Sequence, residues 1–359
     1  MIFVVASLNI IIIPLIYESK LIDIEAKDRL GLVPRKDIAD PEAVNCSEIL
    51  QSFRNDMIDK ARTKDDMNYQ RAFVTLTKTA KPFYVSTHDE IIDKNRAETF
   101  KSQNYYEKQL TLRVAEIFDE KKSNGAESIM LDVGANIGWF SLVAAAHGAT
   151  KVYSFEPNVQ NTIRFCESLQ LNGWLHDGES RRNIVIPILK GASDENGKLE
   201  FYTPDINNPG TFSFAKNTVG KDIDKKKMGD LEVTTLDSFA ERHGWFESKP
   251  TIALFKIDVE TYEKKVFKGA ERLIKSNLIE KIAMEIRTDN IGRDRIAGVN
   301  AITKLLVDAG YELYLHGGWM GPNKPVTKVY TRWEDLAADF IKNNVYNDNV
   351  MFRLQKRFV

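Results

Sequence analysis

The stretch LDVGANIGWF, residues 131–140, decides the fold, because an apolar run stops at an acid, passes two glycines and continues as a second apolar run. This order predicts a buried strand, a tight loop and a helix. Gly134 allows the chain to turn sharply, and Gly138 is expected to let the backbone approach a ligand with no Cβ in the way. In doubly wound sheets ligands bind beyond the carboxyl ends of the strands, so the loop predicts a ligand site.

A second acid, Glu156, ends the next apolar run in YSFEP, about 20 residues after Gly134. An acid at this position commonly accepts hydrogen bonds from the two hydroxyl groups of a ribose. The expected ligand therefore carries an adenosine-like half. The alternative is a strand-to-helix turn that binds nothing, and the paired acids Asp132 and Glu156 argue against it.

The loop favours S-adenosylmethionine over a dinucleotide as the cofactor. Dinucleotide loops follow the pattern G-x-G-x-x-G, in which closely spaced glycines admit a pyrophosphate. Here Asn136 stands where the middle glycine would be, and Asp132 repels a phosphate but attracts an ammonium group. S-adenosylmethionine has a ribose, an amine and a carboxylate, and it has no phosphate.

Strand and helix patterns alternate from Ser128 onward, which predicts an α/β, Rossmann-like, doubly wound sheet that is mostly parallel and covered by helices on both faces. An amphipathic helix with Leu110, Val114, Ile117 and Phe118 on one face leads into it. A hairpin is expected within 197–214. The predicted strands are 129–133, 151–155, 184–189, 252–257, 282–286, 311–315 and 350–354, and the predicted helices are 139–147, 159–171, 262–275, 298–309 and 333–342.

Six segments in matching order resemble the FkbM-type family of S-adenosylmethionine-dependent methyltransferases, from about Phe83 to Leu354. They are LDVGANIGWFSLVAAAHG (131–148), VYSFEPN (152–158), GASDENGKLEFY (191–202), VTTLDSF (233–239), FKIDVETYEKKVFKGAERLI (255–274) and AMEIR (283–287). The resemblance implies a class I methyltransferase sheet with an antiparallel edge strand, and methyl transfer to an oxygen atom. It also implies that Asp132, Gly134, Asn136 and Gly138 surround the methionine part of the cofactor, Glu156 the ribose, and Ser193 and Asp194 the adenine edge.

One residue departs from the family pattern. Where the family reads I-D-V-E-G-x-E, this chain reads IDVETYE, with Thr261 in place of glycine. If the backbone there requires a positive φ, threonine is strained by roughly 1–2 kcal/mol.

Asp258 and Glu260 are the candidate catalytic residues. A hydroxyl group that attacks a methyl sulfonium must lose a proton, which a carboxylate within hydrogen-bond reach can accept. Asp258 ends the predicted strand at 252–257, and Glu260 would share its face if the chain stayed extended. Capping of the following helix is the alternative role for both acids. Glu285 and His316 rank next as candidate bases.

Composition limits the classes of partner and the kinds of site. With 50 basic and 51 acidic residues the net charge is −1, which gives no electrostatic footprint for nucleic acid and favours a small molecule or a glycan. The five histidines show no metal-ligand spacing. The cysteines lie far apart in the chain, no disulfide framework is expected, and Cys166 is expected to be a free thiol that acts as a small hydrophobe.

The first 17 residues carry no charged side chain. They are somewhat short for a spanning helix and contain Asn9 and Pro14, so a membrane anchor, a buried element and a late start of the gene model all remain open. The location is correspondingly open between a membrane of the secretory pathway and the cytoplasm. The predicted organisation is an apolar segment at 1–20, a stem or accessory helical region at 21–82 and a methyltransferase domain at 83–359.

The predicted function is therefore S-adenosylmethionine-dependent methylation of a hydroxyl group on a sugar, a glycan or a secondary metabolite. A membrane-tethered binding protein that keeps the cofactor fold without catalysis is one alternative. A nicotinamide-dependent oxidoreductase is the other, and the glycine spacing disfavours it.

Overall fold

The computed structural model describes residues 40–63, 72–88, 93–103, 105–175, 184–203, 214, 226–287, 293–315, 329–330, 335 and 347–355. All of them belong to one compact unit. Within these ranges no helix is both long enough and apolar enough to cross a bilayer. The apolar segment at 1–20, His316 and, apart from Asp335, the helix expected at 333–342 lie outside the described residues.

The main sheet has eight strands among the described residues, in the order β12-β11-β13-β10-β9-β3-β4-β5. Neighbouring strands from β10 to β5 run parallel, whereas β13 is antiparallel to both of its neighbours. The doubly wound, mostly parallel sheet with antiparallel strands toward one edge is confirmed, but the strand expected at the edge near 350–354, β13, lies between β10 and β11. The bounds are β3 Ile129–Val133, β4 Lys151–Phe155, β5 Val185–Ile188, β9 Ile252–Ile257, β10 Lys281–Arg287, β11 Tyr311–Leu315, β12 Val329–Tyr330 and β13 Asn347–Leu354.

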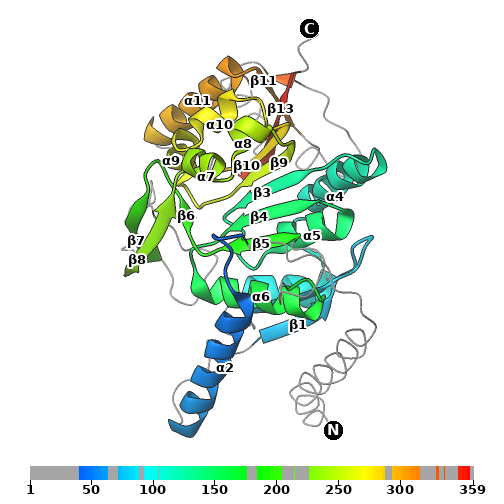
Figure 1. Cartoon of the computed structure of the whole chain (residues 1–359), viewed down its shortest axis with the longest axis vertical. Coiled ribbons are helices and arrows are strands. Elements are labelled where there is room, and N and C mark those ends of the chain that lie inside the picture. Colours follow the sequence, from blue (N-terminus) through cyan, green and yellow to red (C-terminus); the bar gives the residue numbers. More distant parts are fainter. Residues whose placement is uncertain are drawn as a thin grey trace. The chain divides into compact units, whose positions relative to one another are not determined.

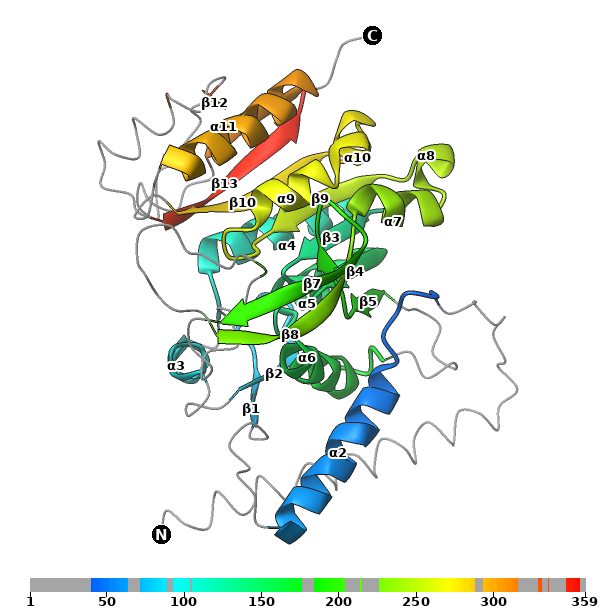
Figure 2. The same ribbon diagram turned by 90° about the vertical axis from the view of Figure 1, so that its left-hand side faces the viewer.

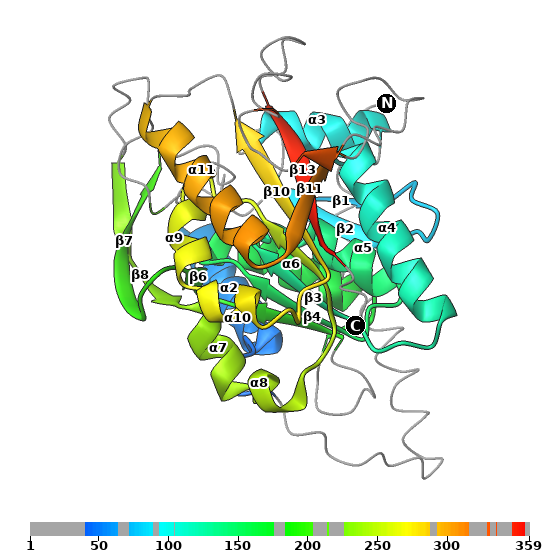
Figure 3. The same ribbon diagram turned by 90° about the horizontal axis from the view of Figure 1, so that it is seen from above.

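Helices cover both faces of this sheet, as predicted. Figures 1 and 3 show α11 on one side of the strands and α4 and α5 on the other. One buried cluster joins the sheet to the first group, which is α7 Leu236–Arg242, α8 Trp245–Ser248, α9 Glu263–Lys268, α10 Glu271–Lys275 and α11 Arg293–Asp308. A second joins it to α2 Cys46–Thr63, α3 Lys94–Gln103, α4 Lys108–Ser123, α5 Trp139–His147 and α6 Val159–Leu171.

The alternation of side chains along each strand assigns them to the two clusters. In β3, Leu131 and Val133 belong to the cluster under α7 to α11, and Met130 belongs to the cluster under α5. Asp132 has the same parity as Met130, so its carboxylate lies on the α5 face.

The predicted helix at 262–275 is two helices, α9 and α10, which corrects the sequence prediction. The chain breaks at Gly269, where a Cβ would lie 1.9 Å from the carbonyl oxygen of Ser193. The second helix begins under the carboxylate of Asp237, which accepts the N–H groups of Arg272 and Leu273 at 3.0 and 2.7 Å. An acceptor at a helix start satisfies donors that have no partner within the helix.

Two small sheets stand apart from the main one. β1 Ala72–Leu76 pairs with β2 Tyr84–His88. β6 Gly191–Ala192, β7 Gly197–Thr203 and β8 Lys226–Thr234 form a three-stranded sheet, whose β7 and β8 make the long ribbon of Figure 2. The hairpin expected within 197–214 thus finds the partner of its first strand farther along the chain.

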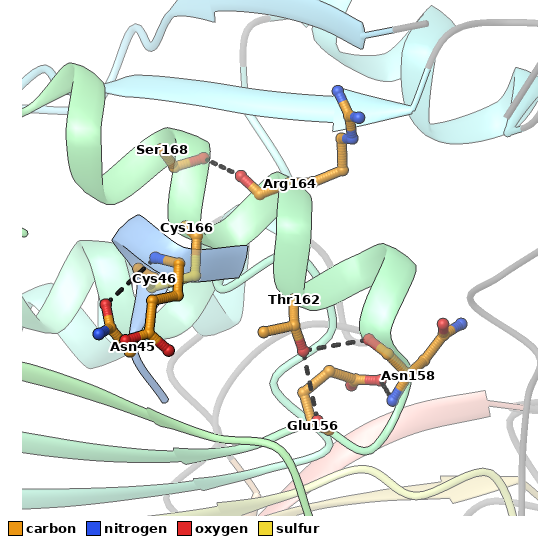
Figure 4. The surroundings of a disulfide bond; sticks show 9 residues. Asn45, Cys46, Glu156, Asn158, Thr162, Arg164, Cys166 and Ser168 are labelled. Atoms are coloured by element: carbon orange, nitrogen blue, oxygen red, sulfur yellow. Dashed lines mark hydrogen bonds between the residues drawn. A yellow bond between two sulfur atoms is a disulfide. The ribbon is translucent and has the colours of Figure 1, made fainter. Parts of the chain in front are cut away.

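Cys46 and Cys166 form a disulfide bond, which corrects the expectation of a free thiol at Cys166. Figure 4 shows the bond joining α2 to the middle of α6. A separation of 120 residues hides the pairing from sequence inspection, because only the packing of α2 against α6 brings the Cα atoms to 5.3 Å. The boundary predicted at residue 82 falls between the paired strands β1 and β2, and the division into stem and domain stays a prediction.

Candidate active site

Two cavities meet at the loop between β3 and α5. Gly134, Asn136, Asp258 and Glu260 line both of them. The first cavity is also lined by Val133, Phe155, Glu156, Pro157, Asn161, Gly191, Ala192, Phe201, Phe214, Val259 and Tyr262. The second is also lined by Arg96, Tyr106, Ala135, Ile137, Trp139, Phe140 and Lys256.

The two glycines of the loop are required for different reasons. Gly134 has φ +78°, and a Cβ there would lie 1.8 Å from the carbonyl oxygen of Asp258. Glycine thus permits the close approach of two strand ends that build the site. Gly138 has φ +82°, and its Cβ would meet the Phe165 ring at 2.1 Å. The expectation that glycine at 138 makes room for a ligand is therefore corrected, because that space belongs to a side chain of α6.

Asp132 lies beneath the loop and lines neither cavity. Its side chain is fully buried, its Oδ2 accepts the Ser141 hydroxyl at 2.6 Å, and its Oδ1 lies 3.7 Å from the Lys256 ammonium. Burial raises the pKa of Asp132, and Lys256 opposes the rise. Its position favours support of the loop over the direct contact with a cofactor ammonium that the sequence suggested.

Asn136 stands between the two cavities with φ +53°, a conformation that asparagine tolerates better than most residues. Its Oδ1 accepts the Ile137 N–H at 2.9 Å and the Arg96 guanidinium at 3.1 Å. Asn136 thus fixes the loop to α3.

Glu156 lines the first cavity, at the position predicted for a ribose contact. Its carboxylate accepts the N–H groups of Asn136 and Asn158 at 2.8 and 2.9 Å and the amide of Asn161 at 3.3 Å. Burial raises its pKa to about 6, although these hydrogen bonds act to lower it. Figure 4 shows Glu156 beside Asn158 and Thr162 at the start of α6.

Ser193 and Asp194, the residues expected at the adenine edge of the cofactor, directly follow Gly191 and Ala192, which line the first cavity. Ser193 is buried and its hydroxyl lies 3.1 Å from that of Tyr262. Asp194 forms ion pairs with Lys265 and Lys268, which bring its pKa to about 2 against the effect of burial. Aromatic side chains Phe201, Phe214 and Tyr262 form the wall beside them.

Asp258 and Glu260 both reach the junction of the cavities. The chain between them does not stay extended, since Glu260 has φ +51° and Thr261 has φ +82°. The condition for both acids to share one face, an extended chain, is therefore not met, although the turn still leaves both at the junction. Thr261 has the positive φ that its place in the family pattern suggested.

Sequence inspection missed three charged residues of the site. Lys256 and Arg96 line the second cavity. Glu263 holds the turn, because its Oε1 accepts the N–H groups of Val259 and Thr261 at 3.2 and 3.3 Å. The signals were present for two of them: a lysine inside the apolar strand FKID and the last acid of IDVETYE. Arg96 lies in a polar stretch whose position depends on tertiary packing.

Together, this fold and this site define a methyltransferase that uses S-adenosylmethionine. A family model described as "Methyltransferase FkbM domain" matches residues 132–313, about half of the chain. The chain belongs to this family, and S-adenosylmethionine is its cofactor. The nicotinamide-dependent alternative is set aside.

Solved structures match parts of this chain at low identity and low TM-score. Methyltransferase FkbM from Methylobacillus flagellatus KT is 17% identical with a TM-score of 0.36, over 64% of this chain and 43% of that one. A SAM-dependent methyltransferase from Agrobacterium tumefaciens is 10% identical with a TM-score of 0.37, over 79% and 70%. M. jannaschii TYW2 in complex with AdoMet is 14% identical with a TM-score of 0.33, over 79% and 86%. A search of curated proteins returned no match.

The residues of the first cavity fit the cofactor. Glu156 would offer a buried carboxylate to a ribose, aromatic rings form a wall near Ala192, and Gly134 and Asn136 line the cavity at the loop. The cofactor supplies a methyl group already activated by a sulfonium. This chain's own residues are left to bind it, exclude water and align an acceptor.

Proposed function

We propose that the protein transfers the methyl group to a hydroxyl of a sugar, a lipid-linked glycan or a secondary metabolite, with the acceptor bound in the second cavity. One observation carries the proposal: Asp258 and Glu260 line both cavities, where a group bound in one meets a group bound in the other. Carboxylates there accept a hydrogen bond from a hydroxyl as it attacks.

Asp258 is the better placed of the two. Its Oδ1 is buried and lacks a hydrogen-bond partner among the described residues, and its side chain is 29% exposed. The exposed part of this carboxylate, which lines both cavities, can accept the hydroxyl proton of a bound acceptor. Helix capping, the alternative role, finds no support at Asp258, because α9 begins at Glu263 with Tyr262 as its N-cap residue, and the turn before the helix is held by the Glu263 carboxylate.

The test is Asp258→Asn. This variant keeps the shape of the side chain and removes the base, so we expect a folded protein with near-normal cofactor binding and single-turnover methyl transfer reduced by about 10²–10⁴-fold. The acceptor is first identified by profiling glycans and metabolites for a methyl group that is lost in cells without the protein. Near-normal transfer by the variant would place the base elsewhere, with Glu260 next.

A cofactor-binding protein without catalysis is the second candidate, favoured by Thr261 in a left-handed conformation beside the junction. Cofactor binding with no turnover on any acceptor would support it. Attachment to a membrane through residues 1–17 and the absence of nucleic acid as a partner also stay proposals. Release of the full-length protein by alkaline carbonate would end the first of these.

A further inference from the structure

A row of polar side chains crosses the middle of the sheet beneath α5. Asp132 of β3 is in register with Ser154 of β4 on one side and with Lys256 of β9 on the other. All three are buried, and Lys256 is only 3% exposed although its strand is otherwise apolar. Neighbouring side chains in register on one face lie close enough to interact. A lysine at this position therefore needs an explanation.

The Lys256 ammonium contacts the parts that build the site. It donates a hydrogen bond to the carbonyl oxygen of Gly134 at 3.1 Å. It lies 3.7 Å from Asp132 Oδ1 and 3.7 Å from Asp258 Oδ2, and 5.3 Å from the centre of the Phe140 ring. One cation thus stands between two carboxylates, directly under the glycine loop.

Packing alone does not explain a buried ammonium, because an apolar side chain of similar length fills the same space without the cost of removing a charge from water. The carboxylates give the reason. Oδ1 of Asp132 and Oδ1 of Asp258 are buried without hydrogen-bond partners among the described residues, and two such groups repel one another. Burial acts to lower the pKa of Lys256, but Asp258 and Asp132 more than offset it, so the ammonium stays protonated.

We propose that Lys256 is a positioning residue of the methyl-transfer site, which ties the glycine loop to the end of β9 and holds the Asp258 carboxylate at the junction of the cavities. The assignment rests on the proposed role of Asp258. It explains the position of Asp258 by a specific arrangement of charges, in which the Lys256 ammonium lies between the carboxylates of Asp132 in β3 and Asp258 after β9.

Other charged and titratable groups facing this row are few among the described residues. Glu107 and Tyr106, between α3 and α4, and Glu156, after β4, face Lys256, while Tyr106 and Glu263 face Asp258. Each of them is anionic or neutral. Loss of Lys256 therefore also raises the pKa of Glu156, in the same direction as that of Asp132. Among the described residues, Lys256 is the only cation within 4 Å of the Asp132 carboxylate. Its removal therefore leaves that carboxylate without a cationic partner.

The test compares Lys256→Met, Lys256→Arg, Asp258→Asn and the double variant Lys256→Met with Asp258→Asn, as full chains without cofactor. Melting temperatures are measured between about pH 5 and pH 8. In Lys256→Met the pKa of Asp132 rises further above its unfolded value, so the melting temperature should fall more at pH 8 than at pH 5. In that background Asp258→Asn should recover at least about half of the loss at pH 8, because it removes one of the two repelling charges.

A packing role predicts the opposite pattern. The loss in Lys256→Met would then be the same at every pH, and Asp258→Asn would add to it. Either result overturns the proposal. If Lys256→Met does not fold alone, the double variant and Lys256→Arg decide the question, since the proposal requires both to fold.

Binding of S-adenosylhomocysteine gives a second readout. We expect Lys256→Met to weaken its binding at least about tenfold, because the Gly134 carbonyl and Asp258 lose their common partner, and Lys256→Arg to change it less than about threefold. Lys281→Met is the matched control, a lysine of the adjacent strand that lines neither cavity. These results do not require the acceptor, so a failed search for O-methylation would sink the proposed function and leave the role of Lys256 standing.

Discussion

At the scale of single residues, Thr261 carries a backbone conformation that β-branched residues rarely adopt. With φ +82° its Cβ crowds the backbone, at a cost of roughly 1–2 kcal/mol. Thr261→Gly should raise the free energy of unfolding by about 1 kcal/mol, less than the full strain because glycine also gains freedom in the unfolded chain. Urea denaturation measures the change.

Thr261→Asn is the control for that substitution, since asparagine tolerates a left-handed conformation and should give a smaller gain. Loss of stability in Thr261→Gly would show that the threonine side chain makes a contact worth more than its strain. The same pair of variants tests the binding-protein alternative, because catalysis that appears only with glycine would mean that Thr261 disables the site.

Glu156 predicts how cofactor binding depends on pH. Its pKa of about 6 means that the carboxylate is ionised at pH 7.5 and about nine-tenths protonated at pH 5. If the ionised form accepts the ribose hydroxyls, affinity for S-adenosylhomocysteine should fall about tenfold from pH 7.5 to pH 5. Calorimetry measures it.

In Glu156→Gln the affinity should be lower and independent of pH over that range. Asp194 does not confuse the result, because its pKa lies at about 2. If the affinity of Glu156→Gln fell by the same factor between pH 7.5 and pH 5, the titrating group would be another residue.

At the scale of secondary structure, local pattern was sufficient where an element is both apolar and regular. The strands 129–133, 151–155, 252–257 and 311–315 and the helices 139–147 and 159–171 were predicted with their observed bounds. β1 and α3 were not predicted, because their residues are mixed in polarity and show no clear period. For β2 only an extended start of the segment after Pro82 was expected, and its antiparallel pairing with β1 was not.

The site divides in the same way. Glu156, Asp258 and Glu260 follow strands and were placed at the cavities from sequence. Two features of the site could not be predicted from sequence: the burial of Asp132 beneath the loop, and the packing of Gly138 against Phe165. Both depend on contacts with residues distant in the chain, and the hydrophobic periodicity of a segment does not identify those residues.

The disulfide between α2 and α6 predicts a large effect on stability. It closes a long loop, so its removal should cost about 2–5 kcal/mol. We expect Cys46→Ser with Cys166→Ser to unfold at lower urea concentration, and a reductant to destabilise the natural chain but not the double variant. Because disulfide bonds form and persist in oxidising compartments, we expect the protein to mature in one. Two free thiols in protein isolated from its native cell would contradict the expectation.

At the scale of the whole molecule, ion pairs connect the segment that precedes α2, residues 40–45, to distant parts of the chain. Asp40 pairs with His243 at 2.9 Å, and Glu42 pairs with Arg242 at 2.7 Å and Lys190 at 3.4 Å. The Val44 N–H donates to the Pro187 carbonyl at the outer strand β5. These contacts hold the chain beside β5 before it enters α2, whose bond to α6 reaches the helix that carries Asn161 of the first cavity.

The ion pair between Asp40 and His243 makes this connection sensitive to pH. The Nδ1 of His243 lies 2.8 Å from the Phe239 carbonyl oxygen and its Nε2 lies 2.9 Å from Asp40 Oδ2, so the protonated ring can donate a hydrogen bond from each nitrogen. Burial lowers its pKa, but Asp40 and the Phe239 carbonyl raise it above 6.5 overall, while His243 holds the pKa of Asp40 below 3.8 against burial.

A histidine with a raised pKa stabilises the fold fully below about pH 6.5 and loses this effect as pH rises through its folded value, whereas Asp40 loses its effect only as pH falls below about 3.8. The free energy of unfolding should therefore decline as the pH rises above about 6.5, by less than about 1 kcal/mol in all, since the pair is partly screened by solvent. His243→Gln should be less stable at pH 6 and should lack this decline. A slope that survives in His243→Gln would assign the titration to another group and leave Asp40 with a hydrogen bond that does not depend on charge.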